Sequence, residues 1–186
     1  MTIEAIVARW GVAAVFAGAM LEGETAVIAG GLIAHQGLVA WPMVFAAATA
    51  GSFLTDQFFF AAGRRYRDRA FVQRWTHKRA FTKALHLLER YPTGFIFAFR
   101  FLYGFRTVSP IAIGTSQVPT ATFVPLNAAA ATVWAALFTA LGYWFGEAVT
   151  EFAGKLQPSQ QTLLLGIAVL SSGFAMFQIM RWWKAR

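Results

Sequence analysis

The stretch that decides the fold, residues 93–119, reads TGFIFAFRFLYGFRTVSPIAIGTSQVP. It is mostly apolar, yet it is too short for two full transmembrane helices, which need roughly 40 residues. Gly104, Pro110 and Gly114 interrupt it with residues that break helices. The charges around it, described next, place both of its ends on the cytoplasmic side, so it must enter the membrane and turn back. We therefore predict a re-entrant hairpin, whose irregular backbone at membrane depth needs protein or a wet cavity around it.

The composition of the chain agrees with a membrane protein. Of its 186 residues, 58% are hydrophobic and 13% are charged, whereas a soluble domain carries about 25% charged residues. The net charge of +8 would also suit a nucleic-acid binder, but most cations lie at 64–90 and 181–186, and no nucleic-acid-binding motif is present. We expect both basic regions to be cytoplasmic. The chain has no cysteine, and we expect no metal or cofactor.

The apolar segments outside the hairpin predict an all-α polytopic fold. Residues 41–62 and 120–146 are each long enough to span the bilayer, and 161–180 form a third such segment. The weakly acidic segment 147–160 is expected outside. The last helix then returns to the cytoplasm, which places the C-terminus inside.

Residues 10–38 have the same pattern as the decisive stretch, because two short apolar runs flank Glu22-Gly23-Glu24. They predict a second re-entrant hairpin of opposite orientation, and hence an inverted repeat of the kind found in transporters. An offset of 83 residues also places glycine on glycine: Gly11 on Gly94, Gly31 on Gly114 and Gly63 on Gly146.

Five charged residues remain in the apolar segments, where a charge is costly and usually faces a partner or an aqueous path. Glu22 and Glu24 lie at the tip of the first hairpin, and Arg100 and Arg106 lie in the second. If the tips meet, the guanidinium groups can hold a phosphate and the carboxylates can bind and release a proton. The alternative is a set of buried ion pairs that only holds the hairpins together. Asp56 suits a coupling role or a helix-packing role.

Neutral residues near these charges are expected to play lesser parts. Ser52 and Thr55 could share the hydrogen bonds of Asp56, and Asn127 could hydrogen-bond a hairpin. Trp134 is interpreted as a lipid-facing or packing residue.

The basic stretch 64–90 interleaves cations with Phe71, Trp75, Leu85 and Leu88. This spacing favours an amphipathic helix on the inner membrane surface, where it would cover anionic lipid headgroups. The alternative is a solvated loop.

The segment from residue 100 to 127, RFLYGFRTVSPIAIGTSQVPTATFVPLN, resembles the DedA family, also called the SNARE-associated or VTT-domain family. The family pattern is Arg-Phe-x-Pro-Gly-x-Arg, then Gly, then Met/Val-Pro-x-x-x-Phe and Asn. The matching positions are Arg100, Phe101, Gly104, Arg106, Gly114, Val118, Pro119, Phe123 and Asn127. Tyr103 stands where many members have Pro.

Two shorter motifs extend the resemblance. Residues 51–64, GSFLTDQFFFAAGR, are similar to the family's Gly-x-x-x-Gly-Asp-x-x-x-Tyr-x-x-Gly-Arg, with Thr55 in place of Gly and Phe60 in place of Tyr. Residues 22–25 are similar to the acidic first-hairpin motif. The resemblance implies one membrane domain over residues 1–150 with two oppositely facing re-entrant hairpins.

The resemblance also implies a function in the bacterial inner membrane. Family members move undecaprenyl phosphate or phospholipids, with proton coupling, and their functional residues are the intramembrane acids and arginines. We thus predict a transporter of a phosphate-bearing lipid, with protons as the coupling ion and anionic inner-leaflet lipids around it; the chain could also form a homo-oligomer. Gly114, Gln117, Pro119 and Asn127 are the supporting residues.

Three alternatives remain open from the sequence. The first is a proton-coupled transporter of a small solute or ion. The second is a membrane enzyme acting on lipid phosphates, although the sequence has no soluble-enzyme motif, and we expect a non-enzyme. The third is a purely structural membrane protein.

Overall fold

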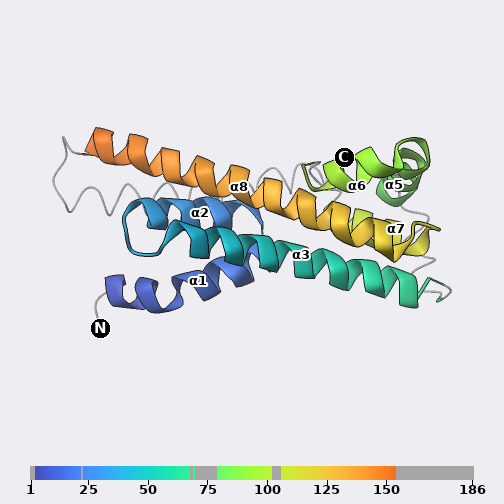
Figure 1. Ribbon diagram of the computed structural model, residues 1–186, viewed down its shortest axis with the longest axis horizontal. Helices are drawn as coiled ribbons and strands as arrows, with labels where there is room; N and C mark the ends of the chain where they lie inside the picture. The colour runs from blue at the N-terminus through green and yellow to red at the C-terminus, as the bar shows by residue number, and fades with distance from the viewer. Residues whose placement is uncertain (1–2, 22, 68, 70–78, 102–105, 154–186) are drawn as a thin grey trace. The chain divides into compact units, whose positions relative to one another are not determined.

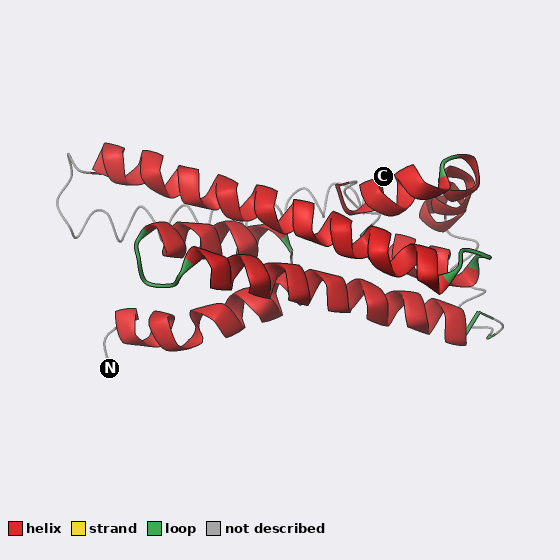
Figure 2. Cartoon of the chain, viewed as in Figure 1, coloured by secondary structure: helices red, strands yellow, loops and turns green. Residues whose placement is uncertain are grey.

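The computed structural model describes residues 3–21, 23–67, 69, 79–101 and 106–153, and the regular elements in these ranges are all helical (Figures 1 and 2). In chain order they are α1 (Ile3–Leu21), α2 (Glu24–His35), α3 (Trp41–Arg65), α5 (Arg79–Arg90), α6 (Pro92–Ala98), the 3-10 helix η1 (Phe99–Phe101), α7 (Val108–Thr115) and α8 (Thr120–Ala153). The predicted all-α class is confirmed for these residues. The helix predicted at 161–180 lies outside them.

The chain divides into two compact units, which we describe separately. Unit 1 is formed by residues 1–44 and 138–186, and unit 2 by residues 45–137. The long helices α3 and α8 contribute residues to both units.

In unit 1 a tight turn joins α1 to α2. Gly23 lies in this turn with a φ of 90°, which side-chain-bearing residues rarely adopt, and its amide donates to the carbonyl of Gly18 at 3.0 Å. The two helices pack closely at Gly18, where an added Cβ atom would overlap the side chain of Ala26. The absence of a side chain on Gly18 permits this approach. Two helical arms and a turn therefore occupy the region where a hairpin was predicted over 10–38.

Unit 2 has a core rich in phenylalanine, to which α5, α6, α7 and the two long helices contribute. Its buried members are Phe60, Phe81, Ala84, Leu88, Phe95, Ile96, Phe99, Ala112, Ile113 and Phe123. The arms α6–η1 and α7 occupy the region of the second predicted hairpin, and the residues between them, 102–105, lie outside the described part.

The amphipathic helix predicted within 64–90 is present as α5, and the apolar side chains described on it pack into protein. Phe81, Ala84 and Leu88 are buried in the unit 2 core. Lys83 and Arg90 are exposed on the other face. The buried residues of α5 pack with Phe95 of α6 and Phe99 of η1, and the contact of the basic stretch with anionic headgroups stays a prediction. Phe71 and Trp75 are among the residues that are not described.

Close backbone contacts join the short helices α2 and α7 each to a long helix. In unit 1 a Cβ atom on Gly31 would overlap the carbonyl oxygen of Thr139 and lie 2.9 Å from the amide nitrogen of Tyr143. In unit 2 a Cβ atom on Gly114 would overlap the carbonyl oxygen of Phe60 and lie 2.9 Å from the amide nitrogen of Arg64. Only glycine allows helices to approach this closely.

By length and composition, one helix among the described residues is long and apolar enough to cross a membrane, the Thr120–Ala148 part of α8. A shorter apolar helix covers Arg9–Leu21. The helix α3 has 25 residues and hence sufficient length, but polar residues such as Ser52 and Asp56 make it less apolar than α8. These same residues form the site described next.

Candidate functional site

Arg100 is the centre of a buried polar cluster in unit 2. It lies in η1 and is 2% exposed. Its guanidinium group forms an ion pair with Asp56 and donates hydrogen bonds to Ser52 Oγ and, at 2.7 Å, to Asn127 Oδ1. Ser52 and Asp56 are one turn apart on α3 and so share a face, while Asn127 comes from α8. Three elements of unit 2 thus meet at one guanidinium group.

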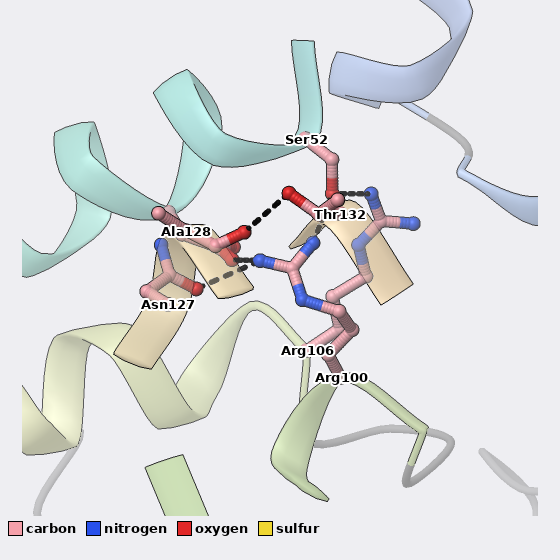
Figure 3. A network of polar contacts seen from close by, with 7 residues as sticks. Ser52, Arg100, Arg106, Asn127, Ala128 and Thr132 are labelled. Carbon is pink, nitrogen blue, oxygen red and sulfur yellow. Dashed lines mark hydrogen bonds and ion pairs between the residues drawn. The ribbon is translucent and has the colours of Figure 1, made fainter. Parts of the chain in front are cut away.

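Arg106 lies beside Arg100, and both approach Ser52 (Figure 3). Its Nη2 atom donates to Ser52 Oγ at 3.3 Å. Its Cζ atom lies 4.8 Å from the centre of the Trp134 ring, and that of Arg100 lies 5.9 Å from the same ring. Arg106 is half-buried, whereas Trp134 is fully buried. The ring therefore supports two cations by cation–π attraction.

The cluster brings two cations together. Arg100 is paired with Asp56, and Arg106 shares Ser52 with Arg100. Buried donors also remain without an acceptor among the described residues, namely Arg100 Nε and Asn127 Nδ2. A buried donor without a partner is costly, and such groups commonly bind water or a ligand. The cluster is thus suited to an anion with several oxygen atoms.

The predicted acidic partners are placed differently. Glu22 lies outside the described residues, and Glu24 begins α2 in unit 1, where it is half-buried. The structure pairs Arg100 with Asp56, which the sequence left between a coupling and a packing role. That Glu22 or Glu24 faces the arginines stays a prediction.

The supporting residues take different positions. Asn127 is part of the cluster, and Gly114 makes the close contact with α3. The carbonyl of Pro119 accepts from the amides of Thr122 and Phe123 at the start of α8, at 3.0 and 3.1 Å. Gln117 is exposed.

Sequence reasoning missed two features of the cluster. Ser52 was expected to share the hydrogen bonds of Asp56, but it accepts from both arginines. Trp134 was interpreted as a lipid-facing or packing residue; its burial agrees with packing, but its contact with the two guanidinium groups was not predicted. A tryptophan within an apolar helix has no sequence signal that separates these roles.

A helical chain with an apolar helix of membrane-spanning length and a buried arginine–carboxylate cluster is typical of polytopic membrane proteins. The VTT domain matches residues 10–144, and the chain belongs to this family, the DedA family of bacterial inner membrane proteins.

Similar proteins include the inner membrane protein YohD of Escherichia coli K12, which is 34% identical over 188 residues, covering 100% of this chain and 95% of YohD. The inner membrane protein YqjA of the same strain is 25% identical, with 89% of this chain and 77% of YqjA covered. The membrane protein slr0232 of Synechocystis is 29% identical, with 80% and 73% covered. No solved structure matches the chain significantly.

Proposed function

We propose that the protein transports a phosphate-bearing lipid, such as undecaprenyl phosphate or a phospholipid, across the inner membrane without changing it chemically. The observation that carries this proposal is that the guanidinium groups of Arg100 and Arg106 converge on Ser52 Oγ, while Arg100 Nε keeps a buried donor without an acceptor among the described residues. A guanidinium group can bind two phosphate oxygens at once, which makes arginine well suited to phosphate.

The two arginines have different tasks in this proposal. Arg100 is neutralised by Asp56 and held by Ser52 and Asn127, so it shapes the site. Arg106 is less buried and is the cation through which a phosphate first binds. The open donors Arg100 Nε and Asn127 Nδ2 are available to further phosphate oxygens.

Asp56 is the group that we propose for proton coupling. A phosphate that binds the guanidinium groups competes with the Asp56 carboxylate for the same donors. A carboxylate that loses its cation in a buried site is stabilised by taking up a proton. Lipid binding and proton uptake are thereby linked. Glu24 remains a second candidate for the same role from the first hairpin.

We also propose the inverted repeat and its two re-entrant hairpins. The close contacts support a repeat because Ile28 and Gly31 of α2 match Ile111 and Gly114 of α7 at the same offset of 83 residues. Each pair contacts a long helix in the same manner. The contacted residues are Thr139, Gly142 and Tyr143 of α8 in unit 1 and Phe60, Gly63 and Arg64 of α3 in unit 2.

The orientation and the lipid environment follow from charge. We propose a cytoplasmic C-terminus and a cytoplasmic basic stretch. The exposed cations Arg67, Lys83 and Arg90 suit anionic inner-leaflet lipids, even though the apolar face of α5 packs on protein.

Lipid movement in proteoliposomes tests the function. Arg106→Ala should abolish transbilayer movement of a labelled polyprenyl phosphate, whereas Arg65→Ala, which removes an exposed cation, should leave it intact. Unimpaired movement by Arg106→Ala would falsify the role of the site. A second measurement follows the entry of inorganic phosphate from the outside medium into the lumen of the same proteoliposomes. Entry of free phosphate without lipid movement would indicate a small-solute transporter instead.

A further inference from the structure

Arg64 lies at the C-terminal end of α3 and reaches the turn that follows α7. Its Nε atom donates to the carbonyl of Gly114 at 3.1 Å, and its Nη2 atom donates to the carbonyls of Ser116, at 3.4 Å, and Val118. The last carbonyls of a helix have no partner within that helix. A guanidinium group carries five N–H donors in a fixed fork. It can therefore bind the carbonyl in the last turn of α7 and the carbonyls of the following turn at the same time.

The backbones beneath this contact are already in close approach. A Cβ atom on Gly114 would overlap the carbonyl oxygen of Phe60, and one on Gly63 would overlap the carbonyl oxygen of Ile111. The end of α7 thus lies directly on the last turns of α3. The Arg64 side chain adds hydrogen bonds to the end of this helix and to the turn that follows it.

An aromatic stack extends the contact to α8. The Cζ atom of Arg64 lies 4.9 Å from the centre of the Phe60 ring. Phe60 in turn stacks on Phe123, with ring centres 4.1 Å apart and an angle of 11° between the planes. Arg64 therefore joins the end of α3, the turn at 114–118 and the first turns of α8. We call this set of contacts the Arg64 clasp.

We infer that Arg64 is a positioning residue, whose clasp fixes the placement of α7 and, through it, of Arg106. Arg106 lies just before α7. This helix has 8 residues and hence a length of about 12 Å. Holding one end of so short a rigid helix limits the positions available to a side chain at its other end. The inference rests on the proposed function only for the role of Arg106.

The simpler interpretation is that Arg64 is one more cytoplasmic cation that sets the orientation of the chain. Its neighbour Arg65 separates the two interpretations because it has the same charge and lies at the same helix end, but is exposed. A role in orientation predicts equal effects at both positions. A clasp predicts an effect at Arg64 alone, and it predicts that lysine fails there, since an ammonium group cannot reach all three carbonyls.

A distance measurement tests the clasp without any transport assay. The chain has no cysteine, so spin labels can be attached at single cysteines replacing Ala61 and Gln117, which are both exposed. In the full-length protein in nanodiscs, the label distance should be narrowly distributed for the parent chain and for Arg65→Ala. It should broaden in Arg64→Ala and Arg64→Lys, and added guanidinium ion should narrow it again in Arg64→Ala. A narrow distribution in both Arg64 variants overturns the clasp.

Transport by the same variants tests the link to Arg106. Arg64→Lys should raise the concentration of polyprenyl phosphate needed for half-maximal transport by about tenfold, as expected for a misplaced binding group, with little change in the maximal rate. If Arg64→Lys broadens the distance distribution but leaves the half-saturating lipid concentration unchanged, Arg64 does not position Arg106. If Arg106→Ala transports normally, the proposed function fails, while the distance measurement still decides the clasp.

Discussion

Arg100 depends on Asp56 more than on any other residue, because the two form a buried ion pair. Removing one partner leaves an uncompensated buried charge, which typically costs 3–5 kcal/mol. We expect Asp56→Ala to lower the free energy of unfolding by about 3 kcal/mol, measured by denaturant titration in detergent micelles.

A double-mutant cycle provides the control for this pair. If the cost arises from the stranded guanidinium group, Arg100→Ala should be less harmful in the Asp56→Ala background than in the parent chain. The coupling energy should be about 1–3 kcal/mol. Strictly additive losses would mean that the two charges are not energetically paired.

Trp134 permits a second test of the polar cluster. Its ring lies under both guanidinium groups and closest to that of Arg106. Cation–π attraction at a desolvated site contributes up to about 2 kcal/mol, so Trp134→Leu should weaken binding of a short-chain lipid phosphate by roughly tenfold. Trp134→Phe keeps an aromatic face and should lose less. Calorimetric titration measures both, and equal losses would assign Trp134 to packing alone.

These residues also mark how far the sequence alone can predict the site. Arg100, Arg106 and Asp56 stand out because charges in apolar segments are rare. Their pairing could not be predicted, since it depends on which helix faces meet. Ser52 and Trp134 carry no charge, and their roles emerge only when α3 and α8 both contribute to one cluster.

Among the elements, α7 is positioned by a contact that only glycine permits. A Cβ atom on Gly114 would overlap the carbonyl oxygen of Phe60, whereas one on Gly94 would meet nothing closer than 4.0 Å. We expect Gly114→Ala to lower the unfolding free energy by about 1–3 kcal/mol, as overpacking usually does. Gly94→Ala should be neutral or stabilising by up to about 1 kcal/mol, because alanine favours the helix.

Thermal unfolding of the two glycine variants provides the comparison. Both substitutions add a single methyl group to a helix of unit 2. The difference between their unfolding temperatures therefore reports on the surroundings of the two glycines. If Gly114→Ala unfolds at the same temperature as Gly94→Ala, α7 does not rely on the close approach to α3.

The helix α5 illustrates what periodicity predicts and what it leaves open. Cations alternating with apolar residues indicated an amphipathic helix, and α5 is one. The pattern could not identify what the apolar face touches, because lipid and a protein core are equally apolar. Phe81 and Leu88 pack into the core of unit 2, and only the opposite, charged face remains for lipid headgroups.

For the whole molecule, the long helices connect the two units. The helix α2 packs on α8, whereas α7 packs on α3, so each short helix contacts a long helix that does not follow it directly in the chain. The offset of glycines suggested a repeat, but not this exchange of partners, which involves residues distant in sequence. Among the described residues, the buried charged side chains belong to unit 2. Ser52 and Asp56 belong to unit 2 alone.

The charge of the cluster leads to a prediction that separates the lipid classes. The three charges of Arg100, Arg106 and Asp56, taken by themselves, sum to one positive charge. A phosphate monoester carries about −1.5 to −2 charges near pH 7, so its arrival would leave an excess of negative charge in a buried site. A phosphodiester, which carries one negative charge, would balance the cluster.

We therefore expect a polyprenyl phosphate to bind with uptake of about one proton, because protonation of Asp56 relieves the excess charge. A phosphodiester lipid should bind with none. Titration calorimetry in buffers of different ionisation enthalpy measures this number directly, and Asp56→Asn should abolish the uptake in protein that still binds lipid. Proton uptake that persists in Asp56→Asn would shift the coupling role to another acid, of which Glu24 at the start of α2 is the first to test.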